Sequence, residues 1–169
     1  MDVDFTADER ADAQDAANIW RAQTSGLADI NLVYDADFND LTTMGLLMDA
    51  DANIVVRRTS DMVTVLKADE EADCFGCVLG WMNAGGIHGP THKAIHGAFV
   101  VDRITAPGIQ IQVMIHEFGH VLGVPHVGAI QGLMYPAVIP GRTACLKKPD
   151  LVAFCGVNEC GIHKMYPCE

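Results

Sequence analysis

Residues 116–126 read His-Glu-Phe-Gly-His-Val-Leu-Gly-Val-Pro-His, and this stretch decides how the rest of the chain is interpreted. His116 and His120 are four residues apart, so on a helix their imidazoles project from one face and can share a metal ion. Gly123 lacks a Cβ atom, so it can turn the chain sharply after the helix and bring in His126 as a third nitrogen ligand. Three neutral imidazoles leave one position of a tetrahedral zinc open, as in catalytic zinc sites.

Glu117 follows the first histidine directly, where its carboxylate could hold a metal-bound water without binding the metal itself. A zinc ion on the three histidines would lower the pKa of its bound water towards about 7 and polarise a substrate carbonyl. Glu117 would take the proton of that water as it attacks and pass it to the leaving group. The spacing alone also fits other zinc hydrolases, and cobalt or manganese could occupy the same ligands.

A second motif follows at residues 132–136, Gly-Leu-Met-Tyr-Pro. With both motifs the chain resembles the metzincin metallopeptidases, whose zinc motif is followed by a tight turn with a methionine beneath the metal. The sequence Leu-Met-Tyr-Pro and the spacing of eight residues between His126 and Met134 are most similar to those of the matrixin branch. The resemblance implies a zinc endopeptidase that cleaves internal peptide bonds, with Met134 as structural support and not as a ligand.

The resemblance also implies an α+β, zincin-like fold in one catalytic domain over residues 1–169. A twisted mixed sheet with two helices would form the lobe above the cleft, about 1–122. A smaller irregular lobe, about 123–169, would hold the methionine turn and a C-terminal helix. Substrate would lie extended along an edge strand, here about 77–82, with a hinge loop at glycines 85 and 86.

By analogy with matrixins, Pro136, Ala137 and Val138 would wall the pocket for the substrate residue just after the scissile bond. The chain also departs from the branch. Valine stands at 127 and at 138, where matrixins commonly carry serine and tyrosine, respectively. Pro136 stands where some other metzincins place a zinc-binding tyrosine, so no tyrosine ligand is expected. The sequence is therefore interpreted as an outlier of the matrixin branch or as a member of a separate small metzincin family, and not as a standard matrixin.

Local patterns predict three helices. Thr6 and Glu9 form a capping box, followed by an apolar helical stripe that ends near Gln23. The zinc motif lies on a helix predicted over about 109–122, and a proline at 149 and a glycine at 156 bracket a third helix over 149–155. Runs rich in β-branched and aromatic residues predict strands at 30–34, 54–56, 62–66, 77–82 and 98–104.

The chain holds six cysteines, at positions 74, 77, 145, 155, 160 and 168. An even number in a small domain favours disulfides and an oxidising, extracytoplasmic compartment, although spacing does not choose among 15 pairings. Four of the six follow residue 140, so bridges are expected to staple the C-terminal lobe. The rival interpretation is a second zinc at Cys74-x-x-Cys77.

The net charge of −11 disfavours binding to nucleic acid. No apolar run of about 18 residues is present, so no membrane span is expected. A basic segment followed by an apolar one is also lacking, so no signal peptide is expected within the sequence. Two further metal sites are weaker hypotheses: calcium near the aspartates at 35, 37 and 40 or at 49 and 51, and a second metal at the histidines at 88, 92 and 96. Gly89-Pro90 argues against a helix through those histidines, which favours loop or strand positions.

Together with the resemblance, the sequence therefore predicts a secreted or extracytoplasmic, monomeric zinc endopeptidase with a polypeptide substrate. Two alternatives stay open. One is a catalytically silent zinc domain that binds a protein partner, against which the intact Glu117 argues. The other is a zinc hydrolase that acts on a non-peptide amide or ester.

Overall fold

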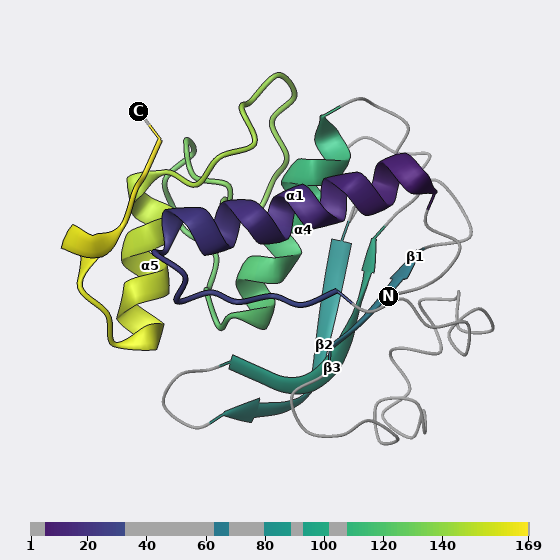
Figure 1. Cartoon of the computed structure of the whole chain (residues 1–169), viewed down its shortest axis with the longest axis horizontal. Helices are drawn as coiled ribbons and strands as arrows, with labels where there is room; N and C mark the ends of the chain where they lie inside the picture. The colour runs from purple at the N-terminus through teal and green to yellow at the C-terminus, as the bar shows by residue number, and fades with distance from the viewer. Residues whose placement is uncertain (1–5, 33–62, 68–79, 89–92, 102–107, 169) are drawn as a thin grey trace.

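The computed structural model describes residues 6–32, 63–67, 80–88, 93–101 and 108–168, with side chains described in the first and last of these ranges. In chain order the elements are α1 (Ala7–Gln23), β1 (Val63–Lys67), β2 (Gly80–His88), β3 (Lys93–Val101), α4 (Ile109–Val121), α5 (Lys148–Asn158) and the 3-10 helix η2 (Ile162–Lys164). Figure 1 shows α1 crossing over α4, with α5 beside the C-terminal end of α1.

The start of α1 follows the predicted capping box. The Thr6 hydroxyl accepts from Glu9 N–H at 3.3 Å, and the Glu9 carboxylate accepts from Thr6 N–H at 2.6 Å. These two bonds satisfy amide groups that a helix N-terminus leaves without partners. The helix runs to Gln23, as predicted, and its buried stripe of Ala13, Ala16, Ala17 and Trp20 faces the core.

The three strands form one sheet in the order β1-β3-β2. β1 pairs with β3 in parallel, and β2 pairs with β3 in the antiparallel sense, so β2 is an edge strand among the described elements. Gly85 and Gly86 lie inside β2, where the register shifts around Gly86. The predicted hinge loop at these glycines is therefore wrong: they mark an irregularity within a strand, where glycine commonly occurs.

The predicted fold class, an α+β metzincin fold built on a twisted mixed sheet, is wrong for the part of the chain whose side chains are described. That part consists of three α-helices, the 3-10 helix η2 and irregular chain, and it contains no strand. Its buried side chains come from helix packed on helix and from the chain after α4. For the strands only the backbone pairing is described, so the buried side chains that the structure describes belong to the helical part of the molecule.

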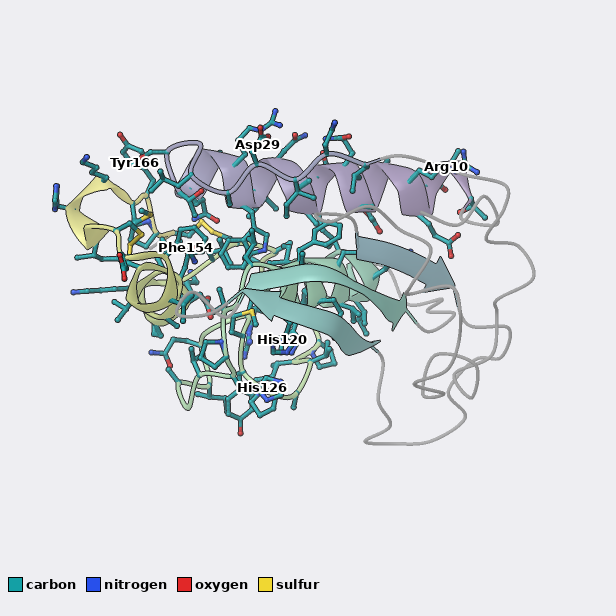
Figure 2. All side chains as sticks on the ribbon, turned by 90° about the horizontal axis from the view of Figure 1, so that it is seen from below. Arg10, Asp29, His120, His126, Phe154 and Tyr166 are labelled. Carbon is teal, nitrogen blue, oxygen red and sulfur yellow. A yellow bond between two sulfur atoms is a disulfide. The ribbon has the colours of Figure 1, made fainter. Side chains whose placement is uncertain are left out.

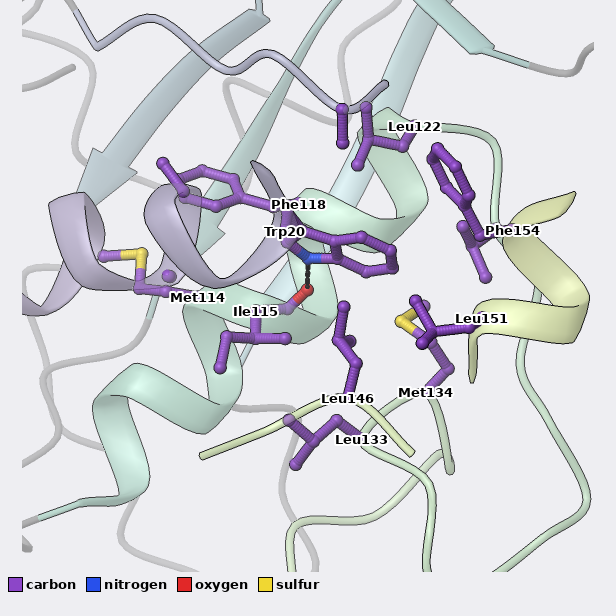
Figure 3. Close-up of a cluster of buried hydrophobic side chains, with 14 of the residues drawn as sticks. Trp20, Met114, Ile115, Phe118, Leu122, Leu133, Met134, Leu146, Leu151 and Phe154 are labelled. Carbon is purple, nitrogen blue, oxygen red and sulfur yellow. Dashed lines mark hydrogen bonds between the residues drawn. The ribbon is translucent and has the colours of Figure 1, made fainter. Parts of the chain in front are cut away.

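Trp20 is the centre of this core. It is fully buried, its indole Nε1–H donates to the Ile115 carbonyl of α4 at 2.8 Å, and its ring lies 5.6 Å from that of Phe154 on α5. Figure 3 shows the indole between these helices, with Met134 and Leu151 close by. One side chain of α1 thereby packs against both other helices, and its polar N–H is satisfied where water is excluded.

Two secondary-structure predictions near the ends of elements need correction. Residues 30–32 form no strand, whereas residues 63–66, 80–82 and 98–101 of the predicted strands lie in β1, β2 and β3. Residues 33–34, 54–56, 62, 77–79 and 102–104 of the predicted strands lie outside the described residues. α5 does not stop before Gly156 but continues to Asn158 and ends at Glu159, whose φ is 51°. Asn158 Nδ2 donates to the Phe154 and Leu122 carbonyls, which stabilises the last turn against the end of α4.

Disulfides tie the C-terminal region together, as predicted. Cys145 pairs with Cys168, and Cys155 pairs with Cys160. Gln23 at the end of α1 joins this region to the helices: its Nε2 donates to the Leu146 and Tyr166 carbonyls, and its Oε1 accepts from Leu146 N–H at 2.8 Å. Cys74 and Cys77 lie outside the described residues, so the alternative of a second zinc at this pair stays a hypothesis.

A candidate three-histidine metal centre

The three histidines of the sequence motif meet in space. The Nε2 atoms of His116, His120 and His126 lie 3.1, 3.1 and 3.2 Å from one another. Figure 2 shows His120 and His126 together on the side of the molecule away from α1. Within the described part of the chain, this is the one group of metal-ligating side chains close enough to hold an ion.

The helix α4 and its ending produce this convergence. His116 and His120 lie on successive turns of α4. Gly123 follows with φ 83°, its N–H donates to the His120 carbonyl, and Val124 N–H donates to the Gly119 carbonyl. This pair of bonds is the Schellman ending, which requires a left-handed residue and so favours glycine. The predicted turn at Gly123 is confirmed, and it redirects the chain towards His126.

Backbone carbonyls fix the orientation of two of the imidazoles. His116 Nδ1 lies 2.8 Å from the Leu133 carbonyl, and His120 Nδ1 lies 2.9 Å from the Val124 carbonyl. A carbonyl can only accept, so each Nδ1 carries the proton and each Nε2 is left with a free lone pair. Such carbonyl contacts commonly set the tautomer of a metal-binding histidine.

This arrangement fits a divalent cation. In a tetrahedral site with Zn–N bonds of about 2.0–2.1 Å, pairs of nitrogens lie about 3.3–3.4 Å apart, close to the spacing here. His116 and His120 present two acceptors to each other, which is unfavourable unless a cation lies between them. Burial also lowers the pKa of His116, and it lowers that of His120 to about 4. Both imidazoles are therefore neutral at physiological pH and available as ligands.

Glu117 lies in a nearly dry environment beside these histidines. Its side chain is 4% exposed, and its Oε2 atom has no hydrogen-bond partner among the described residues. Burial raises the pKa of Glu117 to about 8, because a carboxylate loses its hydration there. A buried carboxyl with a raised pKa beside a candidate metal centre is typical of a group that exchanges protons at neutral pH.

Met134 lies beneath α4 and is fully buried. It approaches α4 at Gly119, where an added Cβ would overlap the Met134 sulfur and would lie 3.0 Å from Trp20 Cζ2. Gly119 thus lets the methionine lie against the helix backbone between the two histidine turns. The role of Gly119 was not predicted from the sequence, although a glycine in the middle of a helix is unfavourable and indicates a packing constraint.

Asp150, which sequence analysis also missed, holds the turn that carries Met134. Its fully buried carboxylate accepts from Leu133 N–H at 2.9 Å, Met134 N–H at 2.9 Å and Lys147 N–H at 2.8 Å. One carboxylate therefore fixes the methionine turn and caps the start of α5. The signal in the sequence was weak: an acidic residue after Pro149 in a first helical turn, which also fits an ordinary cap.

The other residues singled out in the sequence are placed as follows. Pro136 and Ala137 are exposed after the methionine turn, whereas Val138 is half-buried and packs against the core. His88 ends β2 and His96 lies in β3, as expected for strand positions; His92 lies outside the described residues. The aspartates at 35, 37, 40, 49 and 51 also lie outside them, so calcium binding there stays a hypothesis.

Two comparisons bear on the site. A protein-family model described as matrixin matches residues 6–156, which include the three histidines, Glu117 and Met134. A comparison with curated proteins gives no significant match. Among the described residues, no helix is long and apolar enough to cross a membrane.

Proposed function

The chain belongs to the matrixin family, and from this membership and its converging histidines we propose that it is a secreted zinc-dependent endopeptidase. The observation that supports the proposal most directly is the triangle of three Nε2 atoms, 3.1–3.2 Å on a side. His116, His120 and His126 would hold the zinc ion, and the third histidine is more exposed than the other two. Two disulfides in the described part of the chain agree with an oxidising compartment.

Zinc, when bound, supplies a Lewis acid that polarises the scissile carbonyl and makes a water molecule more acidic. The protein residues supply positioning and proton transfer. His116 and His120 are held in one tautomer by the Leu133 and Val124 carbonyls, so their ligand atoms are oriented before binding. Glu117 would accept a proton from the attacking water and deliver it to the departing amine nitrogen.

The burial of Glu117 suits this role. A carboxyl with a pKa close to the working pH can both accept and return a proton without a large penalty in either direction. The positive charge of a bound divalent cation would lower this pKa and favour the carboxylate, the form that acts as a base. Met134 would support the metal site from below without binding the ion, and residues 136–138 would border the pocket for the substrate residue after the scissile bond.

The test is cleavage of a denatured protein substrate by the wild type and by Glu117→Gln, each at one zinc per chain. We expect the wild type to cut internal peptide bonds, chelation to abolish cutting, and Glu117→Gln to retain zinc but lose activity by about 10²–10⁴-fold, the usual contribution of a positioned base. Asp15→Asn, which removes an exposed carboxylate on α1, is the matched control and should behave like the wild type.

The outcomes separate the three functions considered. Equal cleavage by Glu117→Gln and the wild type would show that Glu117 is not the base. Zinc binding by a wild-type protein that cuts neither polypeptides nor small amides and esters would favour a silent interaction domain. Hydrolysis of small esters or amides without cleavage of polypeptides would favour the non-peptide hydrolase.

A further inference from the structure

Arg142 is hydrogen-bonded to the chain that follows His126 and to α4, which carries His116 and His120. The Arg142 guanidinium donates through Nη1 to the Gly132 carbonyl at 2.6 Å and through Nη2 to the Ile130 carbonyl. Ile130 lies between the third histidine and the methionine motif 132–136, and Gly132 is the first residue of that motif. Hydrogen bonds from a charged guanidinium are stronger than neutral ones, and its planar fork fixes the direction of both acceptors.

The backbone of Arg142 is held by α4. Its carbonyl accepts from Gln112 Nε2 at 3.1 Å, and the same Nε2 donates to the Gly108 carbonyl at 3.1 Å. Gln112 is 4% exposed and lies one helical turn before His116 on the same face of α4. The helix that carries two of the histidines is thereby linked directly to the backbone at residue 142.

These bonds close the base of a loop, residues 135–141. The loop begins one residue after Met134, and the Leu133 carbonyl beside it accepts from His116 Nδ1. It returns at Arg142, whose bond to Gly132 brings both ends of the loop together. Within it Pro136, Ala137 and Pro140 are exposed, so side-chain packing restrains these positions only weakly, whereas the half-buried Val138 packs against the core.

We propose that Arg142 is a positioning residue that, together with Gln112, fixes the loop 135–141 relative to the three histidines and so sets which substrate residue is accepted after the scissile bond. This inference rests on the proposed endopeptidase function and on the loop bordering that pocket. Arg142 itself touches neither the metal ligands nor, in this proposal, the substrate. Its effect passes through the backbone that it holds.

The test uses the zinc-loaded protein and the variants Arg142→Met, Arg142→Lys and Gln112→Met. A peptide library reports the residue preference after the cleaved bond, and hydrogen exchange with mass spectrometry reports the loop 135–141 independently of activity. We expect Arg142→Met to keep one zinc per chain, to speed exchange in the loop and to change the ratio of kcat/KM for the two most favoured residues by about tenfold. Arg142→Lys keeps one charged donor and should fall between Arg142→Met and the wild type.

Arg21→Met is the matched control, because Arg21 is an exposed arginine of α1 that pairs with Asp29. It should leave the preference and the loop exchange unchanged. We call the hydrogen-bonded pair Gln112 and Arg142 the clamp. If the clamp acts as one unit, the double variant Gln112→Met/Arg142→Met should change the cleavage preference no more than the single variant with the larger effect. Should Arg142→Met fail to fold, Arg142→Lys and Gln112→Met carry the same measurements.

An unchanged cleavage preference in folded Arg142→Met or Gln112→Met, whether or not loop exchange is faster, would overturn the proposal. Unchanged exchange in the loop would overturn it as well, even in a protein that cuts no peptide. If the wild type cuts no peptide, the endopeptidase proposal fails on its own, and the specificity role of Arg142 fails with it. Faster exchange would then show only that the clamp holds the loop.

Discussion

At the scale of single residues, the metal centre depends on groups whose behaviour is set by burial. Glu117 is the clearest case: its carboxyl lies beside the first histidine, nearly dry, with a pKa of about 8. In the metal-free protein this carboxyl is therefore mostly protonated at pH 7. His120, by contrast, has its pKa lowered to about 4, so its imidazole is already neutral at that pH and its Nε2 need not lose a proton before it binds a metal ion.

These pKa shifts predict where protons come from when zinc binds. A nearby divalent cation favours the carboxylate and lowers the pKa of Glu117, so binding at pH 7 should expel its proton. We expect the wild type to release about one proton more per zinc than Glu117→Gln, as measured by titration calorimetry in buffers of different ionisation enthalpy. At pH 9, where Glu117 is already ionised, the difference should disappear. Equal release by both proteins at pH 7 would contradict the raised pKa.

Gly119 is a second residue whose identity is dictated by its surroundings. Alanine there would overlap the Met134 side chain and press on Trp20, both of which are fully buried. We expect Gly119→Ala to lower the free energy of unfolding by about 1–3 kcal/mol, despite the better helix propensity of alanine. Thermal or urea unfolding of the metal-free protein measures the change without a contribution from zinc.

The matched control for Gly119 is Gly156, which lies inside α5, is exposed and has no neighbouring atom within 4 Å of an added Cβ. Alanine there should stabilise the protein by about 0.5–1 kcal/mol, because it restricts the unfolded chain and favours the helix. Stabilisation by both alanines would mean that Met134 can move aside without cost, and that the methionine does not need the glycine.

At the scale of elements, the site is assembled where one helix ends and another begins. The Schellman ending of α4 at Gly123 directs the chain towards His126, and Asp150 at the start of α5 fixes the methionine turn. The geometry of the metal centre therefore depends more on these two helix ends than on the helix interiors.

Asp150→Asn tests the second junction. The carboxylate accepts hydrogen bonds from three backbone N–H groups. Asparagine has only one oxygen that can accept, and its NH2 group would point a donor at a backbone N–H, which is also a donor. We expect the free energy of unfolding to fall by about 2–4 kcal/mol. At least one buried backbone N–H would lose its acceptor, and the remaining hydrogen bonds would no longer be strengthened by the charge of the carboxylate. Zinc affinity should fall as well, because the Leu133 carbonyl that orients His116 moves with the turn.

Asp29→Asn is the control for this change, since Asp29 is exposed and pairs with Arg21 at the surface. Its effect should stay within about 0.5 kcal/mol. An Asp150→Asn protein as stable as this control, with unchanged zinc affinity, would show that the methionine turn holds its shape without the carboxylate.

At the scale of the whole molecule, the N-terminal helix and the C-terminal segment are joined around Trp20 and Gln23. The Cys145–Cys168 bridge closes a loop with a sequence separation of 23, and the Cys155–Cys160 bridge one with a separation of 5. A longer closed loop restricts the unfolded chain more. Replacing both cysteines of the long bridge by alanine should cost roughly 3 kcal/mol, and replacing those of the short bridge roughly 2 kcal/mol.

The two pairs control for each other, because Cys145 and Cys155 are buried to a similar degree, at 5% and 8% exposure. Unfolding in urea would report both values. The order of the two losses is the sharper part of the prediction: a larger loss for the short bridge would mean that local packing around α5, and not restriction of the unfolded chain, accounts for its stabilisation.

Features set by interactions between residues close in the sequence could be predicted, whereas features set by contacts between distant segments could not. The capping box at Thr6, the turn at Gly123 and the bounds of α1 and α4 could be predicted within about a residue, because local backbone bonds and side-chain period determine them. The end of α5 was predicted wrongly from Gly156, since the contact of Asn158 with the end of α4 extends the helix. The predicted α+β class was wrong for the part of the chain whose side chains are described, because the core of that part is formed by helix packing around Trp20.

The sequence by itself determined the kind of site: the order His-Glu-x-x-His, the glycine that ends the helix and the third histidine fix which side chains can meet, because all lie within one helix and one turn. Tertiary structure alone decided what holds that site in place. The contacts that do so join segments remote in the chain: Gly119 with Met134, Asp150 with the methionine turn, and Gln112 with Arg142. Such contacts leave no periodic signal, because they depend on how the helices pack and not on the spacing of residues along them.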